Sequence, residues 1–151
     1  MHQTFDITRT NRKIVSQLLQ DLTLEQLNAI PEGFNNNIIW NIGHIIVVQQ
    51  MLVYKLSGLP MLISNELVEK YKKGTKPEHQ VTQEEVAEIQ SLLFETINTT
   101  KADFNSKLFK NYQEYPTSVG FIIKNVEDAL SFNYYHEGLH LGIIVSLKKF
   151  I

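Results

Sequence analysis

The sequence predicts an all-α fold: a four-helix bundle with long connections, forming a single domain over residues 1–151. Three observations support this prediction. Four segments carry apolar residues at helical spacing, the later three begin at residues that can cap a helix, and no segment is convincing as a strand. A chain of 151 residues is also long enough to bury a substantial core.

The first helix is predicted from about Thr8 to Leu22, where apolar residues recur at helical spacing. Thr23 and Gln26 then form a capping box, which predicts a short turn of helix over residues 24–30.

The second helix is predicted from a cap in Asn35–Asn37 to Ser57, with Gly58 and Pro60 ending it. Its first half is apolar nearly all round, which is typical of a central helix in a bundle. The β-branched residues also permit a strand, but the length and both caps favour a helix.

A long connection follows, over residues 59–81, and one short helix is expected within it at Asn65–Tyr71. Thr82 with Glu85 is another capping box, and it predicts a third helix reaching about Asn105.

A second connection, residues 106–124, includes a stretch from Val119 to Ile123 that we expect to be short and extended. Asn125 and Asp128 can cap the fourth helix, which we expect to reach Lys149. The two long connections predict a topology other than a simple up-down-up-down bundle.

Composition and charge exclude several kinds of protein. Hydrophobic residues make up 43%, there is no cysteine, and the formal net charge is −2. Neither a disulfide framework nor a thiolate site is possible, and no basic excess is present to bind nucleic acid. The uncharged run over residues 33–54 is too polar for a membrane span, and no signal peptide is visible. These features fit a cytoplasmic protein.

Three histidines lie on the two most apolar predicted helices. His136 and His140 are four residues apart, so they point from one face of the fourth helix. That face also carries Ala129, Phe132, Ile143 and Leu147, and we expect it to point inward. His44 lies within the most apolar run of the chain.

These histidines have two interpretations. Each alone could be a hydrogen-bonded core residue. Together, His44, His136 and His140 could hold a divalent metal with one or two open positions, as catalytic sites do. His2 and His79 lie in the N-terminal tail and in a polar loop, and neither is assigned a role.

Two further residues are candidates near the histidines. Glu137 could act as a catalytic general base toward a metal-bound water, or it could be a paired carboxylate at the edge of the core. Asn41 could contact substrate or support a histidine, although a surface or capping role is equally compatible with the sequence. Gly138 and Gly142 form a small-residue stripe, which we expect to pack against a helix of the same chain. A dimer seam is the alternative.

The residues His136-Glu137-Gly138-Leu139-His140 also match the H-E-x-x-H pattern of zinc proteases. Such a protease needs a third ligand downstream, and only eleven residues follow His140. Ile143 and Ser146 stand where the metzincin continuation requires glycine and histidine. A zincin protease is therefore not expected.

The pattern Trp40-x-x-Gly43-His44, followed by His136-x-x-x-His140-x-Gly142, resembles the DinB-like superfamily over essentially the whole chain. The resemblance implies a four-helix bundle of unusual connectivity, commonly dimeric, whose three histidines bind a divalent metal, often zinc or nickel. Many relatives follow the last histidine with Arg-Gly-Gln. This chain has Leu141-Gly142-Ile143 there and lacks the polar contacts made by those residues.

Two functions follow as expectations. The first is a metal-dependent enzyme that activates a water or a small thiol, either a thiol S-transferase or a hydrolase acting on a small-molecule substrate. The alternative is a non-catalytic metal-binding or dimerising bundle with a role in stress responses.

Overall fold

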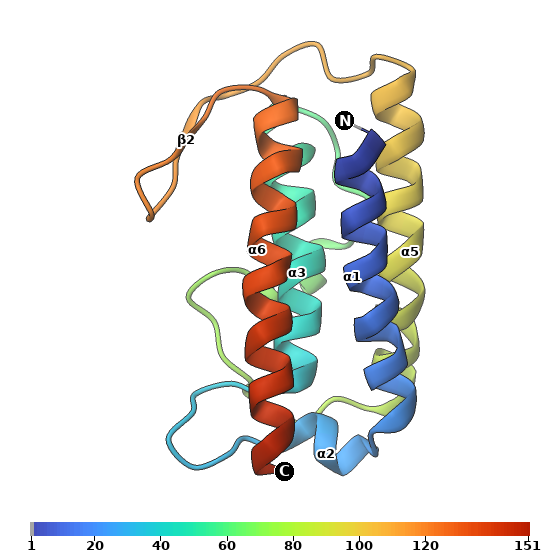
Figure 1. Ribbon diagram of the computed structural model, residues 1–151, viewed down its shortest axis with the longest axis vertical. Helices are drawn as coiled ribbons and strands as arrows, with labels where there is room; N and C mark the ends of the chain where they lie inside the picture. Colours follow the sequence, from blue (N-terminus) through green and yellow to red (C-terminus); the bar gives the residue numbers. More distant parts are fainter. Residues whose placement is uncertain (1) are drawn as a thin grey trace.

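The computed structural model describes residues 2–151, and four long helices dominate it (Figure 1). The long helices are α1 (His2–Asp21), α3 (Ile38–Val53), α5 (Gln83–Asn105) and α6 (Val126–Leu147). The shorter elements are α2 (Leu24–Asn28), α4 (Asn65–Tyr71), the 3-10 turns η1 (Lys55–Ser57) and η2 (Lys148–Phe150), and strands β1 (Tyr115–Pro116) and β2 (Ile122–Ile123). The predicted all-α fold is confirmed.

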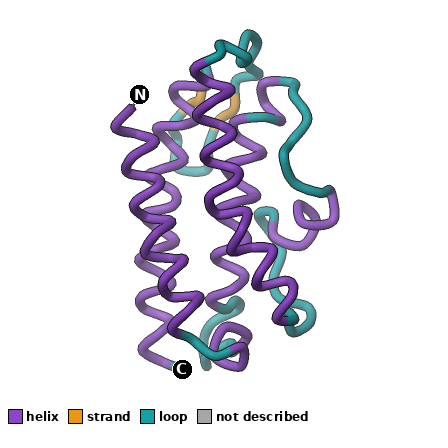
Figure 2. Tube along the Cα trace, turned by 90° about the vertical axis from the view of Figure 1, so that its right-hand side faces the viewer, coloured by secondary structure: helices purple, strands orange, loops and turns teal. Residues whose placement is uncertain are grey.

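The long helices form a bundle in which α1 and α6 run one way and α3 and α5 run the other (Figure 1). Helix α3 packs against both α6 and α5, and α1 packs against the same two helices. Because α3 and α5 are parallel, the segment between them must return along the bundle, and α4 lies on this return beside α3 (Figure 2). The prediction of a topology other than up-down-up-down is confirmed.

The helix boundaries follow local capping chemistry. The side chains of Asn37, Thr82 and Asn125 each accept a hydrogen bond from the backbone N–H three residues ahead, at the first turns of α3, α5 and α6. Gly58 adopts a left-handed conformation (φ 70°) immediately after η1, where the second helical segment ends. These boundaries agree with the sequence-based ones to within a few residues. The start of the first helix does not, because α1 begins at His2 rather than at about Thr8.

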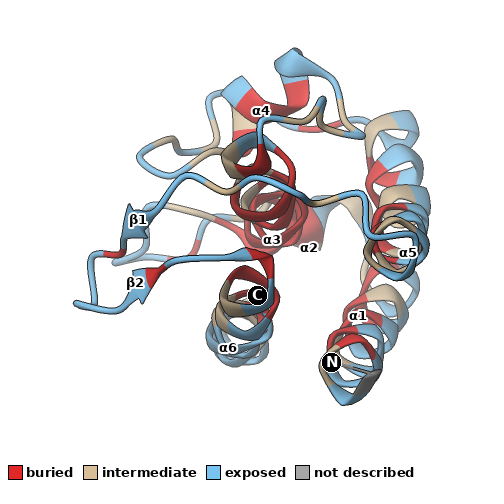
Figure 3. Cartoon of the chain, turned by 90° about the horizontal axis from the view of Figure 1, so that it is seen from above, coloured by how far each residue is buried: buried red, intermediate tan, exposed pale blue. Residues whose placement is uncertain are grey.

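Helix α3 is the centre of the molecule, with 14 of its 16 residues buried. Seen from above, it is surrounded by α2, α4, α5 and α6 (Figure 3). Its sequence is apolar nearly all round for this reason. Among the described residues, no helix is both long and apolar enough to cross a membrane.

The buried face of α6 differs from the prediction. The residues facing the core are Val126, Ala129, Leu130, Asn133, Glu137, Ile144 and Leu147. His136 and His140 flank this face and are only partly buried, and Ile143 is 38% exposed. Glu137, which was considered either as a catalytic base or as a paired carboxylate at the edge of the core, lies inside the core, with an exposed fraction of 1%.

The glycine stripe of α6 also differs from the prediction. A Cβ atom at Gly138 or Gly142 would have nothing within 4 Å, so none of the helices in the described part of the chain packs against either residue. The small residues therefore leave an open surface, and the alternative of an intermolecular contact is still available.

The second connection forms a small antiparallel hairpin, in which Tyr115 pairs with Ile123 and Pro116 with Ile122. It projects beside the upper end of α6 (Figure 1). Of the stretch expected to be extended, Val119–Ile123, only Ile122–Ile123 is a strand, because Gly120 lies in the turn with a φ of 86°.

Candidate metal centre

The three predicted histidines meet between α3 and α6. One ring nitrogen from each of His44, His136 and His140 lies within 4.8 Å of the others. The ring centroids are 5.2 Å apart for His44 and His136, 4.7 Å for His44 and His140, and 4.5 Å for His136 and His140. The spacing of four residues on α6 and the antiparallel approach of α3 produce this convergence. The group could hold a metal ion.

Two of the three rings, those of His44 and His140, are oriented by hydrogen bonds at Nδ1. Nδ1 of His44 lies 2.7 Å from the carbonyl oxygen of Tyr71, and Nδ1 of His140 lies 2.8 Å from Oδ1 of Asn41. Because a carbonyl oxygen can only accept, each neutral ring carries its proton on Nδ1 and keeps a lone pair on Nε2. Partners of this kind orient the histidine ligands of metal sites. Trp40 adds a stacking contact to His44, with centroids 4.7 Å apart.

The third ring, His136, has a polar atom without a partner. Its Nδ1 is buried and forms no hydrogen bond with any described residue. A buried unpaired nitrogen is unfavourable, and either a metal ion or an ordered water beside the ring would satisfy it. Three neutral imidazoles are also a common donor set for zinc, nickel or copper. The residues present therefore fit a divalent metal.

Electrostatics keep all three rings neutral at pH 7. Burial, together with the nearby His140 and His44, lowers the pKa of His136 to about 3. Burial and the neighbouring His44 likewise lower the pKa of His140 to about 4. The pKa of His44 is lowered mainly by burial, against the effect of its hydrogen bond to Tyr71. A neutral imidazole is the form that binds metal.

Helix α4 supports the site through a close contact with α3. A Cβ atom at Gly43 would lie 2.6 Å from the ring of Tyr71, so only glycine allows this approach. The approach brings the Tyr71 carbonyl to His44, the next residue of α3. Gly43 thus has a packing role that explains its place directly before His44.

Glu137 lies beside the site but is already paired. Arg12 of α1 donates from Nη2 to Oε1 at 2.7 Å and from Nε to both carboxylate oxygens at 3.2 Å. Asn133 donates to Oε1 at 2.8 Å. The paired-carboxylate alternative matches these contacts. A catalytic role for Glu137 stays a prediction.

Asn41 lies in the site and is fully buried. Its Nδ2 donates to Oδ1 of Asn36 and to the carbonyl oxygen of Asn37, while its Oδ1 accepts from His140. These contacts match the histidine-supporting role considered for it. Contact with a substrate stays a prediction.

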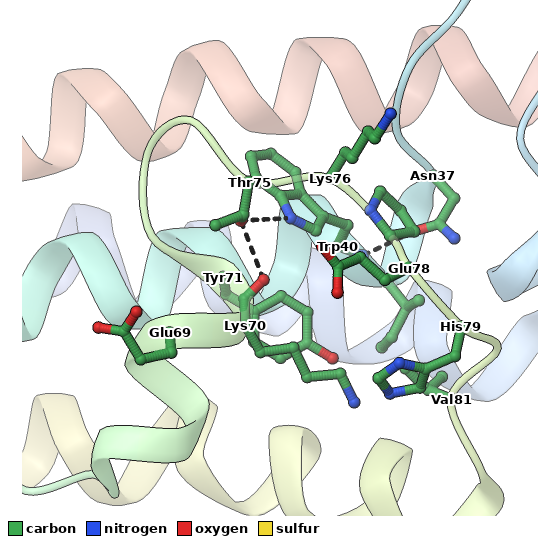
Figure 4. A pocket seen from close by; sticks show the side chains of 12 residues that line it. Asn37, Trp40, Glu69, Lys70, Tyr71, Thr75, Lys76, Glu78, His79 and Val81 are labelled. Carbon is green, nitrogen blue, oxygen red and sulfur yellow. Dashed lines mark hydrogen bonds between the residues drawn. The ribbon is translucent and has the colours of Figure 1, made fainter.

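A pocket whose lining includes Trp40, but none of the three histidines, lies between α3 and the loop after α4 (Figure 4). It is open to solvent and has a cavity volume of about 90 Å³. The Trp40 indole donates to Oγ1 of Thr75, and His79, which the sequence left without a role, lines the wall. Tyr71 also lines it, and its buried hydroxyl has no hydrogen-bond partner among the described residues.

Sequence reasoning missed the supporting residues Arg12 and Tyr71, and it named Trp40 only as part of the family pattern, without its contact with His44. The spacing of Arg12 was a signal that it is buried. It belongs to a stripe of buried α1 residues that recur every three or four positions: Phe5, Thr8, Arg12, Val15 and Leu19. Trp40 lies one turn before His44, which is the spacing for contact on a helix. Nothing local indicates Tyr71, since it acts through its backbone carbonyl from 27 residues away.

Comparison with known proteins gives consistent results. A crystal structure described as the conserved protein of locus from Enterococcus faecalis is 12% identical, with a TM-score of 0.70, over 99% of this chain and 95% of that chain. At this identity the likeness shows the fold alone. A search of curated proteins finds no match. The family model of the DinB superfamily matches residues 7–144, and the chain therefore belongs to the DinB superfamily.

Proposed function

We propose that this protein is a metal-dependent enzyme, which binds one divalent ion through His44, His136 and His140. The observation that carries the proposal is the convergence of three neutral imidazoles within 4.8 Å, two of them oriented through Nδ1. Zinc and nickel suit such a donor set and are the metals we propose.

The proposed chemistry is activation of a water or a small thiol, in a thiol S-transferase or a hydrolase. A divalent ion held by three imidazoles keeps an open position and lowers the pKa of a water or thiol bound there. The protein residues orient the donors: Tyr71 fixes the ring of His44, and Asn41 fixes that of His140. We propose a small-molecule substrate and a cytoplasmic location, the latter because a chain without cysteine fits a reducing compartment.

Metal analysis tests the site directly. We expect protein purified without chelator to contain about one zinc or nickel ion per chain, and His140→Ala to lose most of it. His79→Ala is the control, because His79 lies outside the cluster, and it should keep its metal. Equal metal content in wild type and His140→Ala would contradict the assignment. A screen of thiol-transfer and hydrolase substrates on the metal-loaded protein then tests the reaction.

A second candidate is the dimerising bundle, for which a stress-response role was expected from the sequence, and the outer surface of α6 favours its dimerisation. Tyr135 is 46% exposed, Leu139 49% and Ile143 38%, while Gly138 and Gly142 border open space. Apolar exposure beside small residues suits the approach of a second helix.

Light scattering tests this candidate. We expect wild type to have the mass of a homodimer and Leu139→Asp that of a monomer. Val119→Asp, at the exposed tip of the hairpin, is the control and should stay dimeric. A monomeric wild type would contradict the homodimer, and a dimeric Leu139→Asp would exclude this surface.

A further inference from the structure

A buried ion pair joins three helices next to the histidine cluster. Arg12 of α1 and Glu137 of α6 have side chains with no exposed surface. The guanidinium also donates from Nη1 to the carbonyl oxygen of Leu93 and to Oγ1 of Thr96, both on α5, at 2.8 Å each. One side chain therefore connects α1, α5 and α6 through directional bonds.

Stability alone does not explain this pair. Taking both charges out of water is unfavourable, and apolar side chains of similar volume often stabilise a fold as well or better. The hydrogen-bond geometry does constrain orientation. A guanidinium that bonds both oxygens of one carboxylate fixes the orientation of that carboxylate as well as its position. The pair is thus suited to fix how α6 is rotated about its own axis.

The rotation of α6 matters for the metal site. Glu137 follows His136 directly, so the two side chains point about 100° apart around the helix. When Glu137 faces Arg12, the histidines point toward α3. A slip of one residue would turn α6 by about 100° and move both rings away from His44. The remaining core residues of α6 are mostly aliphatic and would resist such a slip only through packing.

We propose that Arg12 and Glu137 are positioning residues, whose ion pair sets the rotation of α6 and so brings His136 and His140 to His44. This inference rests on the proposed metal-binding function. In this inference the ion pair touches neither metal nor substrate. If α6 rotated, the hydrogen bond between Asn41 and His140 would be the first contact to break.

The test replaces both charges at once, with Arg12→Met/Glu137→Leu, so that no buried charge is left unpaired. We expect a thermal midpoint equal to or above that of wild type, together with a zinc dissociation constant raised about 10- to 100-fold in a chelator competition assay. Nitrogen NMR of the metal-free protein should show wild-type His140 with its proton on Nδ1 and the variant with a mixture of tautomers. Wild-type affinity and a wild-type His140 tautomer in the double variant would overturn the inference.

Two controls separate positioning from stability. Leu27→Ala removes a buried side chain of α2, and it should lower the thermal midpoint while leaving the zinc affinity of the folded protein unchanged. Arg9→Met removes the exposed contact from α1 to Asn98 of α5 and should change neither property. A loss of zinc affinity in Leu27→Ala as large as in the double variant would overturn the inference.

The outcomes also distinguish this inference from the proposed function. If wild type binds no zinc or nickel, the proposed function fails, and the tautomer of His140 in the metal-free protein still tests the positioning role. If the apolar double variant does not fold, Arg12→Gln/Glu137→Gln removes the charges but keeps hydrogen-bonding groups. We expect that variant to lose zinc affinity and the single His140 tautomer, and wild-type behaviour in both would overturn the inference.

Discussion

At the scale of single residues, the hydrogen bonds at Nδ1 of His44 and of His140 decide which nitrogen of each ring is available to a metal. Asn41 is the side-chain partner of His140, and its own amide is held by Asn36 and Asn37. We expect Asn41→Ala to weaken zinc binding about 10-fold, because His140 would lose its fixed orientation and tautomer. Isothermal titration with zinc measures the effect.

Asn36→Ala is the matched control for this prediction. It removes a partner of the Asn41 amide but leaves the contact between Asn41 and His140, so its zinc affinity should stay within about threefold of wild type, below the loss typical of a direct partner. Similar losses in both variants would mean that the orientation of Asn41, rather than its contact with the ring, is what matters.

The imidazoles also make the stability of the metal-free protein depend on pH. The pKa values of His136 and His140 are depressed to about 3 and about 4, from an ordinary value of 6.5, chiefly by burial. As the pH falls below about 6.5, the unfolded chain therefore binds protons before the folded one. The free energy of unfolding should fall between pH 6.5 and 4, by at most about 1.4 kcal/mol per pH unit per histidine, and by less because the partly exposed rings are screened by solvent. Urea unfolding in chelator measures it.

The double variant His136→Asn/His140→Asn provides the comparison for the pH prediction. It removes two of the depressed pKa values, so its free energy of unfolding should change less than that of wild type over the same range. An identical pH dependence in the two proteins would show that other groups are responsible.

At the scale of elements, packing makes two glycines behave oppositely, because Gly43 of α3 meets α4 whereas Gly138 of α6 borders open space. Gly43→Ala would place a methyl group 2.6 Å from the Tyr71 ring. We expect it to destabilise the fold by about 1–3 kcal/mol and to weaken zinc binding, because the Tyr71 carbonyl must move from His44. Gly138→Ala meets open space and should stabilise α6 by up to about 1 kcal/mol. Chemical denaturation of both variants measures the difference, and destabilisation by Gly138→Ala would contradict the packing described here.

Helix boundaries were predictable because their signals are local. Asn37, Thr82 and Asn125 each bond to a backbone N–H only three residues away, so a short stretch of sequence contains both partners. The buried face of α6 was not predictable in this way. A carboxylate is normally expected outside a core, and Glu137 is buried only because Arg12, 125 residues away, is buried with it.

In the candidate site, too, residues with a local sequence signal were predictable and residues that act over long sequence distances were not. His44, His136 and His140 were identifiable from residue type, spacing and apolar surroundings, and the structure brings them together. Their supports were harder to find. Asn41 could be suspected from its place one turn before His44, whereas the backbone carbonyl of Tyr71 leaves no mark in residue identity.

At the scale of the whole molecule, the histidines come from helices separated by α4 and α5 in sequence, so only the folded chain can present all three. A metal bound there must therefore stabilise the entire bundle. At a free zinc concentration 100 times the dissociation constant, the gain should be about 2.7 kcal/mol, or roughly 5–10 °C in the thermal midpoint for a chain of this size. Calorimetry with zinc and then with chelator should show the shift and its reversal. His44→Ala should show neither, and an equal zinc-dependent shift in that variant would mean that the ion stabilises the fold from another site.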